Sequence, residues 1–155
     1  MKKSVTLSAE EVINYVTLYI GDQLFGLPIH KVQDVFQLNR ITVVPLAPPE
    51  YAGVLNLRGR IVTALNLRVR LGLPPSEENK TPMAVGIEYG GEAFCFLIDK
   101  VGEVLRVENS TYESNPVNLD PRWAKVSSGI HRLAGQLMIV LDVDMILDIG
   151  HEIAA

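Results

Sequence analysis

The chain has 155 residues and a formal net charge of −4, with 48% hydrophobic and 21% charged residues. The negative charge argues against nucleic acid as the main partner, and no apolar run approaches the ~20 residues of a membrane-spanning helix. The single cysteine, Cys95, excludes an internal disulfide. We therefore expect a cytoplasmic protein of one or two small domains, with no metal and no cofactor.

The N-terminal region predicts a polar arm followed by a β-hairpin. Residues 1–12 are polar and weakly patterned, and we interpret them as a flexible arm. Side chains alternate from residue 15 to residue 20 as in a strand. Gly21 and Asp22 mark a turn, and the returning strand ends at Pro28, because proline cannot donate to a ladder.

The central stretch reads as a second hairpin followed by a capped helix. It has a strand over residues 54–58, a turn at Gly59 and a second strand over residues 61–65. Gly59 suits the turn because glycine enters positive φ at little cost. The side chain of Asn66 can accept hydrogen bonds from the exposed amides of the next helical turn.

Both of these blocks recur later in the chain, in the same order. Residues 16–36 align with residues 85–105, so that Phe25 matches Phe94. The central unit also recurs, at a second constant offset. Its structural turn and cap residues Gly53, Gly59 and Asn66 align with Gly129, Gly135 and Asp142. The chain is therefore a duplication with pseudo-twofold character.

The repeats predict an all-β fold made of two small barrels. Each half carries two hairpins and a third strand, placed near residues 36–44 in the first half and near 105–107 in the second. Five short strands within ~60 residues favour a closed barrel, which also removes sheet edges. We expect barrel subdomains at about 14–71 and 82–149, joined by a Pro-rich linker at 72–81. The pattern is also compatible with an exchange of chain segments between the two barrels.

The central hairpin carries a family resemblance. The stretch Gly53-Val54-Leu55-Asn56-Leu57-Arg58-Gly59, followed by Asn66-Leu67-Arg68, resembles the G-V-x-N-L-R-G…D-L-R signature of the CheW family of chemotaxis adaptors. The segments FGLPI at 25–29 and KVQDV at 31–35 resemble its second strand and its K-V-Q-E-I segment. The similarity covers about residues 14–149. Asn66 replaces the commoner Asp, Asp34 replaces Glu, and the second hairpin lacks the Asn-Leu-Arg triplet.

The resemblance implies two SH3-like five-stranded barrels around a shared apolar core, short helices and no catalytic activity. It also implies two partners: the cytoplasmic helical tip of chemoreceptors and the regulatory domain of a CheA-type histidine kinase. The protein would then lie at receptor arrays on the membrane through those partners. The alternative is an SH3-like peptide- or protein-binding scaffold in another two-component or motility pathway.

The resemblance places a receptor-binding groove between the barrels. The expected receptor-binding residues are Val32, Asp34, Val35, Arg58, Val101 and Val104. As an alternative, the valines only plug the barrel ends, and Arg58 belongs to a solvated basic face with Arg60, Arg68 and Arg70. Because Arg58 aligns with Ala134 in the repeat, barrel folding alone does not require an arginine there.

Kinase-binding residues are expected near two connections. Ile41, Val43 and Val44 precede Pro45, and Leu119 and Trp123 lie in the second connection. Burial in the core is the competing interpretation for at least one of the first three and for Trp123, although aromatic residues are enriched at interfaces.

Enzymatic interpretations find little support. Cys95 lies within a predicted strand without a basic neighbour that would lower its pKa. Neither His30 nor His131 is repeated in the other half, and the Gly90-Gly91 pair lacks the lysine and helix of a phosphate-binding loop.

Overall fold

The computed structural model describes residues 11–74 and 82–147 of the chain. Most of the predicted N-terminal arm and of the 72–81 linker lies outside these residues. Within them no helix is long and apolar enough to cross a lipid bilayer.

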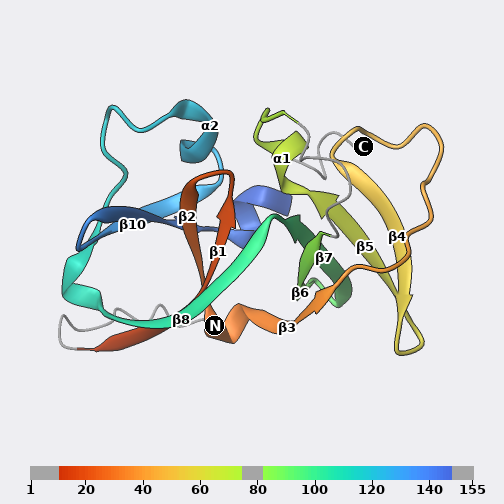
Figure 1. Cartoon of the computed structure of the whole chain (residues 1–155), viewed down its shortest axis with the longest axis horizontal. Coiled ribbons are helices and arrows are strands. Elements are labelled where there is room, and N and C mark those ends of the chain that lie inside the picture. The colour runs from red at the N-terminus through yellow and green to blue at the C-terminus, as the bar shows by residue number, and fades with distance from the viewer. Residues whose placement is uncertain (1–10, 75–81, 148–155) are drawn as a thin grey trace.

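Two β-sheets with short helices make up the fold (Figure 1). The six-stranded sheet has the order β8 (Lys100–Glu108), β1 (Val12–Ile20), β2 (Gln23–Pro28), β11 (Gln136–Leu141), β10 (Ser127–Leu133), β9 (Tyr112–Glu113). The five-stranded sheet has the order β3 (Val32–Gln37), β6 (Met83–Tyr89), β7 (Glu92–Ile98), β5 (Arg60–Asn66), β4 (Tyr51–Leu57). The helices are α1 (Leu67–Arg70), α2 (Pro121–Ala124) and the 3₁₀ turns η1 (Ile29–Lys31) and η2 (Asn109–Thr111), and residues 143–147 are also helical. The expected all-β class with short helices is confirmed, and the two-residue β9 brings one sheet to six strands.

Each half of the chain contributes to both sheets. The N-terminal hairpin β1–β2 joins the six-stranded sheet, where β2 runs parallel to β11. The hairpin β6–β7 joins the five-stranded sheet, where β7 runs parallel to β5. Segments 14–71 and 82–149 therefore describe the sequence repeat, whereas the sheets are built by exchanging one hairpin between the halves.

The registers of the strands confirm the duplication. Val32 lies opposite Ile87 in the β3–β6 ladder, and the aligned Val101 lies opposite Leu18 in the β8–β1 ladder. A register shift follows at the matching point of each ladder. The parallel ladders agree residue by residue as well, with these equivalent pairs: Ala64–Cys95 and Val140–Gly26.

The core is divided by strand alternation into one shared cluster and two smaller ones. Side chains such as Phe25, Phe96 and Ile139 point into the shared cluster, which both sheets cover. The neighbouring side chains Cys95 and Met138 point to the other face of their respective sheets. There they belong to the two smaller clusters, each formed mainly by strands of a single sheet. Each of these clusters lies on the face of its sheet opposite the shared core, as expected where a sheet curves into a small β-barrel.

Three local predictions need correction. Strand β3 is Val32–Gln37 and not residues 36–44; the residues after Gln37 are irregular apart from one bridge, between Thr42 and Val54. Strand β8 extends over Lys100–Glu108, well beyond residues 105–107, since it pairs along β1. Gly53 and Gly129 lie inside β4 and β10, at register shifts. Gly53 has φ +148° and approaches the Thr42 carbonyl too closely for any side chain.

Candidate docking surfaces

Two of the predicted receptor-binding residues form an ion pair. Arg58 Nη1 donates to Asp34 Oδ2 at 2.7 Å, and the two side chains are 73% and 25% exposed. Arg58 lies in the β4–β5 turn and not on the strand, because β4 ends at Leu57. Asp34 lies on β3, an edge strand. An exposed pair of this kind contributes little to stability, so its groups are available to a partner.

The backbone of the β4–β5 turn directs Arg58 toward Asp34. Arg58 has φ +55° and Gly59 has φ +83°. Asn56 Oδ1 accepts the Gly59 N–H at 3.0 Å, which closes the turn. Among the described residues, only Leu46 and Arg58 combine a side chain with positive φ. The cost is about 1–2 kcal/mol, and the equivalent turn of the second repeat avoids it at Ala134.

A glycine makes room for the Asp34 carboxylate. Asp34 faces Gly86 in the β3–β6 ladder, and a Cβ built on Gly86 would lie 2.5 Å from Asp34 Oδ1. The carboxylate therefore lies against the sheet, above the buried Cys95. Burial raises the pKa of the Cys95 thiol to about 12, and the Asp34 charge adds to this shift.

A pocket of about 170 Å³ opens beside this ion pair. Its apolar lining comes from all the strands of the five-stranded sheet: Phe36, Leu57, Val62, Ile87, Ala93 and Phe94. A second polar group stands near its rim, where Gln33 donates to Glu88 at 2.7 Å and Arg60 lies 3.7 Å from the same carboxylate. The pocket has the size of one apolar side chain.

The four predicted receptor-binding valines lie on the two edge strands, β3 and β8, and divide into two classes. Val32 and Val101 are partly buried against the shared core. Val35 and Val104, each three residues farther along its strand, are 38% and 55% exposed. The alternative that the valines only plug the barrel ends thus explains the buried part of Val32 and Val101. Val35 and Val104 instead present apolar surface to solvent, where packing of the fold does not require it.

The predicted kinase-binding residues are placed differently from one another. Val43 is 70% exposed and Val44 is also exposed, whereas Ile41 packs on the five-stranded sheet's own cluster. Trp123 packs on the shared core, edge to face with Phe25 at 5.3 Å between ring centroids. Leu119 packs there too. The core interpretation therefore describes three of these five side chains, and the exposed apolar surface is at Val43 and Val44.

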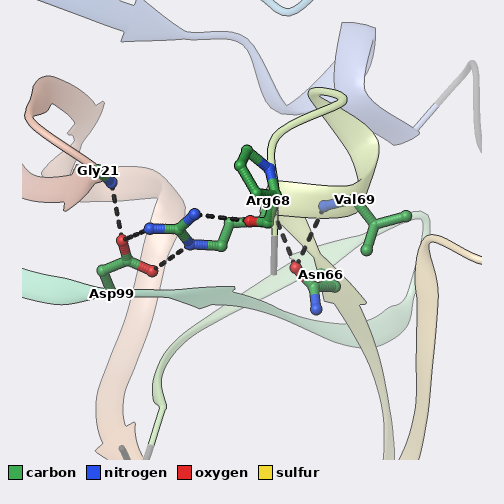
Figure 2. Close-up of polar contacts among 6 residues, drawn as sticks. Gly21, Asn66, Arg68, Val69 and Asp99 are labelled. Carbon is green, nitrogen blue, oxygen red and sulfur yellow. Dashed lines mark hydrogen bonds and ion pairs between the residues drawn. The ribbon is translucent and has the colours of Figure 1, made fainter. Parts of the chain in front are cut away.

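The interpretation of the basic run as a solvated face holds for the exposed Arg58 and Arg60 but is wrong for Arg68 and Arg70. Arg68 makes a bidentate pair with Asp99, through Nε at 2.9 Å and Nη2 at 2.5 Å (Figure 2). Arg70 is half-buried, and its Nε and Nη2 have no hydrogen-bond partner. Burial lowers the pKa of Arg70, and the charge of Glu50 partly opposes this shift.

The caps and turns lie where the repeat places them. Asn66 Oδ1 accepts the N–H groups of Arg68 and Val69 at 3.0 and 3.3 Å. Asp142 Oδ1 accepts the Met145 N–H at 3.1 Å, at the start of the second helix of this kind. Gly135 has φ +84°, close to Gly59. These residues shape the hairpins β4–β5 and β10–β11, the first of which carries Arg58 in its turn.

One buried polar residue was assigned no role from the sequence. His131 is fully buried, with Nε2 3.1 Å from the Tyr15 hydroxyl and Nδ1 2.8 Å from Thr111 Oγ1. Burial lowers its pKa, against the opposing influence of Glu113 and of a hydrogen bond with Thr111. In the sequence, His131 is a single histidine within an apolar strand, and nothing there separates this hydrogen-bonded role from ordinary packing.

The described residues contain no group of three or more His, Cys, Asp or Glu side chains that could hold a metal ion. The surfaces described above are instead apolar side chains with charged groups beside them. Such surfaces bind other proteins.

Comparison with known proteins gives a consistent result. Residues 14–150 match the family model described as CheW-like domain. The chain is 28% identical over 138 residues to the chemotaxis protein CheW of Helicobacter pylori, covering 89% of this chain and 83% of that one. It is 31% identical over 133 residues to the chemotaxis protein CheW of Thermotoga maritima, covering 83% of each. The crystal structure of the scaffolding protein TtCheW from Thermoanaerobacter tengcongensis has the same fold, with a TM-score of 0.78 at 24% identity over 87% of this chain and 92% of that chain.

Proposed function

The chain belongs to the CheW family of chemotaxis coupling scaffolds, which are not enzymes, and from this we propose that it links chemoreceptors to a CheA-type histidine kinase. The observation that carries the proposal is that two groups of exposed apolar side chains lie on different elements of the fold. One lies on the edge strands β3 and β8, at Val35 and Val104, and the other lies in the β3–β4 connection, at Val43 and Val44.

The edge-strand surface suits the helical tip of a receptor. A helix presents a narrow apolar stripe with charged residues at its margins. Val35 and Val104 offer apolar area to such a stripe, and the partly buried Val32 and Val101 precede them on the same strands. Arg58 and Asp34 lie beside it and can pair with charges of the helix. Because each valine is already partly covered, its full burial would contribute less than the roughly 1.5–3 kcal/mol of a side chain buried from full exposure.

The connection between β3 and β4 suits the regulatory domain of the kinase. Val43 and Val44 are exposed on it, and the Thr42–Val54 bridge fixes its path with two backbone hydrogen bonds, of 2.8 and 2.9 Å. Leu119 and Trp123 would contribute through their packing on the shared core, which supports the second connection. Partners bound at these surfaces would place the protein at receptor arrays on the membrane.

The coupling that follows is geometric. A scaffold with equal affinity for both receptor states cannot shift the kinase by itself. It acts by holding the kinase where a receptor movement changes the kinase's own conformational equilibrium. Two surfaces on one rigid body are sufficient for this, and no reactive group is needed.

Binding measurements test the proposal. The full chain is mixed with a purified kinase regulatory domain and with a receptor cytoplasmic fragment, and the two affinities are measured by calorimetry. We expect Val104→Asp to weaken receptor binding alone and Val43→Asp to weaken kinase binding alone, each with an unchanged melting temperature. Failure of the wild-type chain to bind either partner, or co-purification with an unrelated scaffold instead, would overturn the proposal.

A further inference from the structure

The Arg68–Asp99 pair lies where the chain crosses from one sheet to the other. Asp99 is the single residue between β7 of the five-stranded sheet and β8 of the six-stranded sheet. Arg68 lies in α1, directly after β5 of the five-stranded sheet. The two side chains are 19% and 24% exposed, so the pair is largely removed from water.

Further hydrogen bonds tie both side chains to the backbone (Figure 2). Asp99 Oδ2 accepts the Gly21 N–H at 2.7 Å, from the β1–β2 turn of the six-stranded sheet. Arg68 Nη1 donates to the Pro74 carbonyl at 2.7 Å. The Asp99 backbone N–H donates to the Tyr19 carbonyl at 3.1 Å. The network, which we name the crossing latch (Gly21, Arg68, Pro74 and Asp99), joins elements of both sheets.

The other crossing between the sheets is built differently. It runs through η1, from β2 to β3, and the residue aligned with Asp99 is His30. The residue aligned with Arg68 is Asp144. Both His30 and Asp144 are exposed. The duplication alone therefore does not account for the latch, which braces the crossing that leads into β8.

We propose that the crossing latch is a positioning device that fixes β8 relative to β3, and thereby sets the receptor affinity without any contact with the receptor. The inference rests on the proposed receptor surface. Val101 lies two residues after Asp99, and Val104 lies three residues farther along the same edge strand. The edge strand β3 belongs to the other sheet. Any rotation between the sheets therefore changes the separation of the two edge strands that hold a receptor helix.

The energetics favour a positional role over a stabilising one. A buried ion pair loses hydration of both charges, so its net contribution to stability is small even when its geometry is good. The planar fork of arginine fixes direction as well as distance, which lysine cannot do. The bidentate pair and the backbone hydrogen bonds at Gly21 and Pro74 together restrict the relative orientation of the elements that carry Arg68 and Asp99.

The test measures the edge-strand separation directly. Spin labels at the exposed positions Gln37 and Arg106, introduced as cysteines, report the distance between β3 and β8. The buried Cys95 thiol, with its raised pKa, does not compete for the label. We expect a narrow distance distribution in the otherwise unchanged protein. We expect a broader or displaced one in Asp99→Asn and in the double variant Arg68→Gln/Asp99→Asn, which leaves no unpaired buried charge.

Binding gives the second readout. We expect both variants to bind a receptor cytoplasmic fragment about five- to tenfold more weakly, with an unchanged affinity for the kinase regulatory domain. Val140→Ala, which destabilises the six-stranded sheet's own cluster, is the matched control and should leave both affinities unchanged. An unchanged distance distribution, or equal loss of both affinities in step with the melting temperature, would overturn the latch. A wild-type chain that binds no receptor would instead overturn the proposed function, and the distance measurement would still decide whether the latch positions β8.

Discussion

The carboxylate of Asp34 lies over the α-carbon of Gly86, its partner across the β3–β6 ladder, and is held there by Arg58. The absence of a side chain at Gly86 is what lets this charged group lie against the sheet at an edge that faces solvent. The glycine thus determines the geometry of a surface to which it contributes no side chain. Gly86 thus serves the packing of the sheet, while Asp34 and Arg58 are left to present charge at the surface.

We predict that Gly86→Ala displaces the Asp34 carboxylate at little cost in stability. The new Cβ would lie 2.5 Å from a carboxylate oxygen, which can rotate away, so the free energy of unfolding should change by less than about 1 kcal/mol. Gly129→Ala is the matched comparison. Its Cβ would lie 2.6 Å from the backbone carbonyl of Glu113, which cannot rotate away, so the loss should be about 2–3 kcal/mol. Urea unfolding measures both, and equal losses would contradict the prediction.

Arg58→Glu should weaken receptor binding while leaving the fold intact. The side chain is 73% exposed and belongs to a turn that Asn56 and Gly59 already close. Reversing its charge places two carboxylates together at the rim, which repels an acidic group on a receptor helix. Thermal melting and pull-down with a receptor fragment measure the two effects, with Arg132→Glu as an exposed control. A large fall in melting temperature would assign Arg58 a structural role.

The pH dependence of stability should contain a contribution from His131. Burial lowers its pKa in the folded protein, while the unfolded chain takes up a proton near pH 6.5. The stability that His131 supports is therefore complete above about pH 6.5 and decreases as the pH falls below this value, by at most about 1.4 kcal/mol per pH unit. Urea unfolding at pH 7.5 and 5.5 measures it. The variant His131→Gln keeps hydrogen-bonding groups but cannot titrate, and an equal slope in both proteins would exclude His131 as the source.

Cys95 should be unreactive toward alkylating agents in the folded protein. Its thiol is fully buried, and burial together with Asp34 raises its pKa to about 12, so the reactive thiolate is scarce at pH 8. Mass spectrometry after iodoacetamide treatment should show modification only in denaturant. Rapid modification of the native protein would reopen the possibility of a cysteine-based activity. An added surface cysteine at Gln37 serves as the positive control.

Much of the local structure follows from the sequence because local chemistry determines it. The turn at Gly59 and the cap at Asn66 depend on backbone angles and on hydrogen bonds within three residues. The repeat then transfers both to Gly135 and Asp142. The exchange of hairpins does not follow in this way, because the parallel pairs β2–β11 and β5–β7 join segments far apart in the chain whose apolar patterns would suit either sheet.

The surfaces were harder to predict than the fold. Val35 and Val104 are exposed, while Val32, with the same residue type and neighbourhood, is largely covered. Arg68 belongs to the same basic run as Arg60, yet it is paired between the two sheets. In both cases the sequence gives the residue type, but the burial depends on the angle at which the two sheets meet, and that angle is a tertiary property.

The exchange of hairpins also governs how the protein is made. As the chain leaves the ribosome, the five-stranded sheet can close once β7 is complete at Ile98. The hairpin β1–β2 meets its outer partners later, because β1 pairs with β8, which ends at Glu108, and β2 pairs with β11, which ends at Leu141. The first strands to be synthesised can thus pair with each other early, but their other neighbours in the sheet are made much later. A break in the backbone between residues 74 and 82 would leave two pieces that are each unable to fold, but that are able to complete one another when mixed.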